Sequence, residues 1–197
     1  MATEEGTNLV PERRESIWSV GVRQVVYIAL GIALYAVLNI IFNLVQLPNA
    51  GGGAIALRPG IVIPLFFGVV FGPIVGLFVG GFGNIIGDLI SFHNFYWNWD
   101  LGNALVGFIA GLVVLYTAGR YRTTRAIVFA EIASAIAIAV GIAIAAYNDI
   151  WVSKISFAAA NSEFIVAGIP DLINGLILLP ILLIAYNAAI RSRGRAY

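Results

Sequence analysis

The sequence predicts an all-α integral membrane protein with six transmembrane helices and with both ends of the chain in the cytoplasm. Hydrophobic residues make up 60% of the chain and charged residues 11%, against about 45–50% and about 25% in soluble domains. So few charged residues cannot cover the surface of a water-soluble protein. The composition therefore excludes a soluble enzyme, a nucleic-acid-binding protein and a disordered chain, and the absence of cysteine excludes a disulfide-stapled secreted domain.

Polar segments divide the chain into a tail, a membrane domain and a second tail. Residues 1–17 form a polar cytoplasmic tail, residues 18–190 the six-helix transmembrane domain, and residues 191–197 a basic cytoplasmic tail. A helix needs about 20 mostly apolar residues to cross the hydrocarbon core of a bilayer. The predicted spans cover residues 22–45, 59–72, 73–91, 101–118, 126–147 and 164–190.

The apolar block of residues 59–91 is too long for one upright helix and short for two. Phe71-Gly72-Pro73 is a turn signal within it. With a turn there, nine of the eleven basic residues lie on the side of the chain ends, and only Arg58 and Lys154 lie on the other. Cytoplasmic flanks are enriched in Lys and Arg, so two spans fit better than one. The first of them is so short that neighbouring helices must shelter it or the bilayer must thin.

Small residues recur at helical spacing in several spans. Gly68, Gly72, Gly76 and Gly80 follow one another every four residues, and Ala29 and Ala33 do the same in the first span. Helices in membranes associate through the close backbone approach that small residues allow. The glycines therefore predict tight packing inside the bundle.

Signatures of catalysis and of metal binding are missing from the sequence. There is one histidine, His93, and there is no HExxH, GxSxG or Walker-type phosphate-binding motif. A single histidine rarely suffices for a metal site. We therefore expect no enzyme activity, no ATPase in this chain, no cofactor and no metal.

Polar and aromatic residues gather at the predicted outer ends of the spans. Ionisable groups within a span usually face the bundle interior or a wet cavity, and Asp88 and Asp171 are the strongest cases. Aromatic rings would stack on a flat ligand while carboxylates and amides accept and donate hydrogen bonds. Outer acidic residues outnumber Arg58 and Lys154, which favours a neutral or cationic ligand. The candidate binding residues are Asn84, Asp88, His93, Tyr96, Trp97, Trp99, Asp100, Asn103, Trp151, Glu163, Asp171 and Asn174.

Several segments are together specific enough to point to a family. They are the Ala29-x-x-x-Ala33 pair, the Gly-rich loop after the first span, residues 57–64, 71–76 and 83–88, and Trp97-Asn98-Trp99-Asp100-Leu101-Gly102-Asn103. Over residues 20–190 the chain resembles the substrate-binding S components of energy-coupling factor (ECF) vitamin transporters. Residues 1–10 contain no histidine, which disfavours the branch that binds cobalt or nickel.

The resemblance implies a complete mode of action. The chain would bind a small heterocyclic vitamin or vitamin precursor on the outer side, with Gly51–Gly53 as a flexible lid. It would then dock, through Ala29 and Ala33, on a membrane scaffold (T) subunit driven by two cytoplasmic ATPase subunits. The chain would lie in the plasma membrane of a prokaryote as a multi-pass protein.

Two other functions remain open from the residues alone. A stand-alone channel or secondary transporter is the main alternative, although no internal repeat is evident between residues 20–100 and 100–190. An intramembrane enzyme would use Asp88, His93 and Asp171 as acid–base groups, but no known catalytic spacing supports it. Trp and Tyr also gather at membrane interfaces without binding a ligand.

Overall fold

The computed structural model of the chain describes residues 18–49 and 54–193. The predicted tail of residues 1–17, the Gly51–Gly53 lid and residues 194–197 lie outside the described residues. The elements, in chain order, are α1 (Val22–Phe42), β1 (Gln46–Pro48), β2 (Ala54–Ala56), a 3₁₀ turn η1 (Pro59–Ile61), α2 (Val62–Phe71), α3 (Pro73–Phe92), α4 (Trp97–Gly111), α5 (Val114–Thr117), α6 (Thr124–Val152) and α7 (Phe157–Arg193).

The described residues form an all-helical bundle with one short hairpin, so the predicted fold class is confirmed. Strands β1 and β2 pair antiparallel, with Leu47 opposite Ile55. Within the described residues, five segments are long and apolar enough to cross a membrane: Val22–Phe42, Pro73–Phe92, Trp97–Thr117, Thr124–Val152 and Phe157–Ser192. The sixth predicted span corresponds to the shorter apolar segment Pro59–Phe71, and its crossing of the bilayer stays a prediction.

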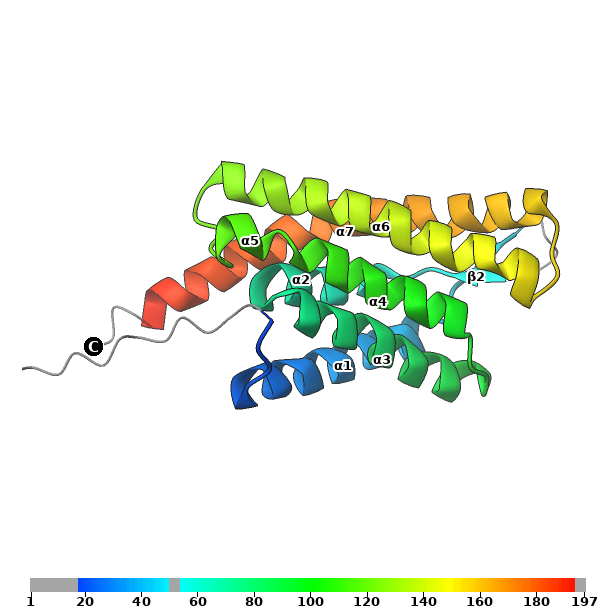
Figure 1. The fold of residues 1–197 in the computed structure, drawn as a ribbon, viewed down its shortest axis with the longest axis horizontal. Coiled ribbons are helices and arrows are strands. Elements are labelled where there is room, and N and C mark those ends of the chain that lie inside the picture. The colour runs from blue at the N-terminus through cyan, green and yellow to red at the C-terminus, as the bar shows by residue number, and fades with distance from the viewer. Residues whose placement is uncertain (1–17, 50–53, 194–197) are drawn as a thin grey trace, which may run out of the picture.

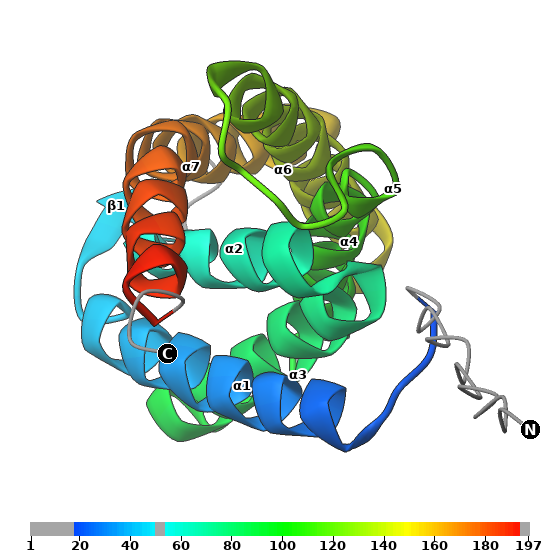
Figure 2. The same ribbon diagram turned by 90° about the vertical axis from the view of Figure 1, so that its left-hand side faces the viewer.

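The short helix α2 lies in the middle of the bundle. Viewed along the bundle, it runs between α1 and α3 on one side and α6 and α7 on the other (Figure 2). Its apolar side chains Val62, Leu65 and Val69 are buried in the main core cluster. Neighbouring helices therefore shelter this segment, as its length requires.

A sharp turn at Gly72 separates α2 from α3, as the sequence predicts. Gly72 has φ +106° and ψ 168°, a conformation that a residue with a Cβ rarely adopts. Pro73 follows as the first residue of α3 and has no N–H to give to the Val69 carbonyl four residues earlier. The Tyr121 hydroxyl donates to that carbonyl instead, at 2.6 Å. Burial raises the pKa of Tyr121 to about 12, so this donor stays protonated at neutral pH.

Glycines bring the backbones of α3 and α4 into direct contact. A Cβ built on Gly76 would overlap the carbonyl oxygen of Gly107, and a Cβ on Gly107 would overlap that of Gly76. Gly80 meets the Asn103 carbonyl in the same way. The prediction that the glycine repeat serves internal packing is confirmed for this pair of helices.

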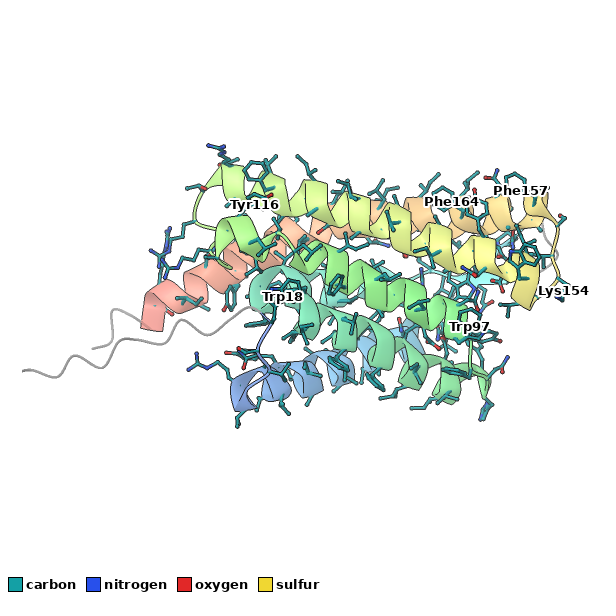
Figure 3. The ribbon with its side chains drawn as sticks, viewed as in Figure 1. Trp18, Trp97, Tyr116, Lys154, Phe157 and Phe164 are labelled. Carbon is teal, nitrogen blue, oxygen red and sulfur yellow. The ribbon has the colours of Figure 1, made fainter. Side chains whose placement is uncertain are left out.

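The two ends of the bundle differ in charge. We call the end that holds the exposed arginines Arg23, Arg120, Arg122, Arg125 and Arg191 the arginine end. The start of α1 and the end of α7 both lie there (Figure 1). We call the opposite end, which carries β1, β2 and the α3–α4 and α6–α7 links, the hairpin end. Lys154 lies at the hairpin end (Figure 3). That the arginine end faces the cytoplasm stays a prediction.

Helices α6 and α7 extend further toward the hairpin end than the sequence predicts. α6 continues to Val152 and α7 begins at Phe157, so Asp149 and Glu163 are helical rather than in a loop. Trp97 and Trp99 likewise belong to the first turn of α4. Hydropathy predicts that a span ends where polar residues begin. Here the helices continue through these polar residues, several of which face the bundle interior.

Candidate ligand-binding site

A buried ion pair lies beneath the hairpin. Arg58, which comes after β2 and just before η1, donates from Nη2 to Asp171 Oδ2 at 2.5 Å. Arg58 is 7% exposed and Asp171, on α7, is 1% exposed. Burial by itself would lower the pKa of Arg58, but the neighbouring acidic groups, Asp171 first among them, together outweigh burial and raise this pKa above its usual value. The guanidinium is therefore charged, and the pair fixes the start of α2 to α7.

Asn103 joins this pair to two other helices. Its Oδ1 accepts from the Tyr35 hydroxyl of α1 at 2.9 Å and from Arg58 Nη1 at 3.4 Å. Its Nδ2 donates to the Trp99 carbonyl, one turn earlier in α4, at 2.8 Å. Asn103 and Tyr35 are fully buried, so one amide holds α1, α4 and the Arg58 segment together.

A second buried network centres on Asn84 of α3. Asn39 of α1 donates from Nδ2 to Asn84 Oδ1 at 3.2 Å. Asn84 Nδ2 lies 2.9 Å from Asp88 Oδ2 and 2.9 Å from Asp100 Oδ1. Asn39, Asn84, Asp88 and Asp100 are all buried. The carboxylates of α3 and α4 therefore face each other across one amide instead of facing lipid.

Trp99 is held in place from two directions. Its indole Nε1 donates to Asp149 Oδ2 of α6 at 2.7 Å, and the Arg58 guanidinium lies 5.5 Å from its ring centre. Asp149 is itself buried and accepts from the Ser153 hydroxyl at 2.6 Å. The Trp99 ring is thus fixed before any ligand arrives.

These groups surround a cavity of about 370 Å³ at the hairpin end. That volume lies within the range of small-molecule sites, near its lower end. β2 contributes Ile55 to the wall. The lining residues are Asn43, Gln46, Ala54, Ile55, Ala56, Arg58, Asn84, Asp88, Phe92, Tyr96, Trp99, Asp149, Ser153 and Glu163. The wall combines aromatic rings with amide and carboxyl groups, a composition typical of sites for polar ring compounds.

Some buried polar atoms at this end have no hydrogen-bond partner. They include Asp100 Oδ2, Asn39 Oδ1, Arg58 Nε and Glu163 Oε2, whereas Glu163 Oε1 accepts from Asn49 Nδ2 at 3.3 Å. Buried polar groups are normally bonded, and exceptions call for an explanation. Glu163 and Arg58 line the cavity, so a bound ligand or water would meet their open positions.

The structure brings most of the predicted site residues together. Asn84, Asp88, Tyr96, Trp99 and Glu163 line the cavity. Asp100, Asn103 and Asp171 do not line it but bond directly to residues that do.

Four predicted site residues lie away from the cavity. Trp97 is exposed at the hairpin end (Figure 3). Residues two apart on a helix point in nearly opposite directions, and Trp99 faces the cavity. Trp151 is 74% exposed. His93 is exposed, with φ 56°, where α3 ends, and Asn174 is half-buried on α7.

Sequence reasoning did not single out several residues of the site, among them the lining residues Asn43, Gln46, Phe92 and Ser153. Arg58 was expected only as an outer positive charge, and Asp149 as an outer-loop acid. Tyr35 and Asn39 were not singled out, although they lie four residues apart in an otherwise apolar span, where a polar stripe at helical spacing signals an inward face. The Arg58–Asp171 pairing joins residues 113 positions apart, and nothing local signals it.

No group of three or more His, Cys, Asp or Glu side chains that could hold a metal ion occurs within residues 18–49 and 54–193. The carboxylates of the site are held by amides, the Trp99 indole and Arg58 instead.

The fold and the cavity define an all-α integral membrane protein with a polar, aromatic-lined cavity at one end of its bundle. Residues 19–188 match the family described as the ECF-type riboflavin transporter, S component. The chain belongs to this family. It is therefore a substrate-binding component of ECF transporters and not an enzyme. Like other ECF S components, it is a multi-pass membrane protein of prokaryotes.

Bacterial relatives support the assignment over most of the chain. A UPF0397 protein of Streptococcus gordonii is 30% identical over 171 residues, which covers 84% of this chain and 88% of the relative. A UPF0397 protein of Streptococcus thermophilus is 29% identical over 180 residues, covering 88% and 94%. A UPF0397 protein of Onion yellows phytoplasma is 37% identical over 91 residues, 46% of each chain.

Proposed function

We propose that the cavity at the hairpin end captures a small heterocyclic vitamin or vitamin precursor from the outer side of the membrane. The observation that carries this proposal is the 370 Å³ cavity, whose wall combines the fixed Trp99 ring with Asp88, Asp149 and Glu163. Such groups are expensive to place within membrane-spanning helices unless they serve a site. The family description names riboflavin, so riboflavin is the first ligand to test.

Titration of the purified protein with a vitamin panel, followed by tryptophan fluorescence, tests the proposal. We expect saturable quenching by at least one ligand, because Trp99 lines the cavity. Trp99→Phe should remove most of that response and weaken binding, whereas Trp97→Phe, at an exposed neighbouring position, should leave both intact. Absence of a response across the panel, with and without a scaffold subunit, would contradict the proposed function.

We further propose that the α1 surface around Ala29 and Ala33 docks on an ECF scaffold subunit, which two cytoplasmic ATPase subunits drive. Both alanines are exposed, on a helix whose other side packs through Tyr35 and Gly31. The result is a smooth apolar stripe on the outside of the bundle, suited to close helix contact.

Substituting these alanines separates docking from binding. Ala29→Trp or Ala33→Trp should abolish ATP-driven uptake by the assembled transporter while leaving ligand affinity unchanged, because the cavity lies at the hairpin end. Ile136→Trp, at an exposed position of α6, is the matched control and should transport normally. An equal loss of affinity in the alanine variants would show that the docking assignment is wrong.

A further inference from the structure

The charges around the cavity do not balance. Of the residues that the structure describes, Arg58 is the only basic one lining the cavity, and Asp171 pairs with Arg58 at 2.5 Å. This is the only ion pair among the residues that the structure describes. Asp88, Asp149 and Glu163 also line the cavity, and so they remain without a basic partner in the described part of the chain.

Neutral donors, and not cations, hold these three carboxyl groups. Asp88 accepts from the Asn84 amide. Asp149 accepts from the Trp99 indole and the Ser153 hydroxyl. On Glu163 one oxygen accepts from Asn49, while Oε2 is buried without a partner. These donors orient the carboxyl groups but supply no positive charge, so the wall offers acidic groups to a cation with no competing basic side chain on them.

Aromatic rings in the same wall point to the same ligand chemistry. Phe92, Tyr96 and Trp99 all line the cavity, and the rings of Phe92 and Tyr96 meet edge to face with centroids 6.3 Å apart. Aromatic faces attract organic cations, and rings combined with carboxylates are a recurring way to bind ammonium groups. Trp99 already has one cation against its ring, the Arg58 guanidinium at 5.5 Å.

We propose, building on the function proposed above, that the ligand is a positively charged nitrogen heterocycle. It carries either a protonated amine on its ring or a fixed positive charge within the ring. The cationic group lies beside Glu163 and Asp88, and the ring lies against Trp99. The volume of about 370 Å³ favours a ligand of modest size.

Matched ligand pairs that differ only in charge test this. Pyridoxamine and pyridoxine share a ring and differ by an ammonium and a hydroxyl group. The 5-aminomethyl and 5-hydroxymethyl forms of 4-amino-2-methylpyrimidine differ in the same way. Thiamine adds a fixed cation and riboflavin a neutral ring system. Binding of each is measured by isothermal titration at pH 7.

The outcomes separate the two proposals. The ligand-charge inference predicts that thiamine or the ammonium member of a pair binds about tenfold or more tightly than the neutral compounds. Equal or tighter binding of riboflavin or of the neutral members would overturn the charge inference and leave the proposed function standing. Failure of every compound to bind would overturn the proposed function and the inference together.

A pair of isosteric variants locates the charge effect. Glu163→Gln should weaken binding of the cationic ligand about tenfold and leave a neutral ligand unaffected. Glu131→Gln is the matched control, since Glu131 lies toward the arginine end of α6, away from the cavity lining. Asp88→Asn should act in the same direction as Glu163→Gln. Unchanged cation affinity in both site variants, with thermal unfolding showing that they are folded, would overturn the inference.

Discussion

The half of the bundle toward the arginine end (the arginine half) and the half toward the hairpin end (the hairpin half) share the same long helices but differ in their buried side chains. Toward the arginine end the buried side chains are mostly Val, Leu, Ile and Ala, and α3 and α4 meet through Gly76 and Gly107. Toward the hairpin end the buried positions of α1, α3, α4, α6 and α7 carry Asn, Asp and Tyr. The comparison teaches that the apolar and glycine contacts of the arginine half hold the helices together. The Asn, Asp and Tyr side chains of the hairpin half can then meet in the bundle interior.

The two halves also differ in what a substitution costs. A buried charged or polar group is tolerated while its ion-pair or hydrogen-bond partner is present, because a group left without a partner keeps its full desolvation penalty. A contact between two glycines leaves no charge unpaired when it is changed, but a side chain added there overlaps the facing backbone. Substitutions in the hairpin half should therefore act through lost partners, and those in the arginine half through steric overlap.

The largest effect is expected when one partner of the buried ion pair is removed. Asp171→Ala leaves the Arg58 guanidinium buried and unpaired, which should reduce the free energy of unfolding by about 3–5 kcal/mol. Thermal unfolding in detergent micelles measures the loss. Replacing both partners, as Arg58→Met with Asp171→Leu, should cost less, because no isolated charge remains. Equal losses in the single and double variants would show that the pair itself is not what matters.

A smaller effect is expected at the glycine contact of the arginine half. Gly76→Ala places a methyl group against the Gly107 carbonyl, so α3 and α4 must move apart, at a cost of about 1–3 kcal/mol. Gly168→Ala on α7 is the control, because its added Cβ would meet only Ile142 Cγ2 at 3.8 Å. That control should be neutral or stabilising, since alanine favours helix. If Gly76→Ala melts like Gly168→Ala, the close-contact account of this half is wrong.

The arginine half was the more predictable of the two from sequence. Gly72-Pro73 and the four-residue glycine spacing are local patterns whose consequences, a turn and a close helix contact, do not depend on distant residues. In the hairpin half, the position of Asp88 and Asp171 within apolar spans predicted that both side chains face the bundle interior or a wet cavity. It did not show that Arg58 pairs with Asp171, because that contact depends on where β2 places Arg58 relative to α7.

Helix phase explains the remaining differences within the hairpin half. Trp97 and Trp99 have equal weight in a composition argument, yet only Trp99 turns toward Asp149 and the cavity. Asp149 falls where the hydropathy of the sequence already suggests a loop, and only the continuation of α6 to Val152 turns it inward. Such assignments need the rotation of each helix, which is set by packing and not by local sequence.

The smallest effect tests the one polar cluster that we find within the described core of the arginine half. Tyr121→Phe removes the hydroxyl that donates to the Val69 carbonyl. Pro73 has no N–H to replace this donor, so the free energy of unfolding should fall by about 1 kcal/mol. Tyr116→Phe, at a position 87% exposed, is the matched control and should have no effect.

The effect of Tyr121→Phe should also depend on pH in a defined direction. Burial raises the pKa of Tyr121 in the folded protein to about 12, above the value near 10 of an exposed tyrosine. The hydroxyl therefore stabilises the fold fully below about pH 10, and this contribution is lost as the pH rises toward 12. Melting curves should show a constant gap between the wild type and Tyr121→Phe at pH 7–9 and a narrowing gap above pH 10. A gap that does not narrow would mean that the hydroxyl does not act as the buried donor to Val69.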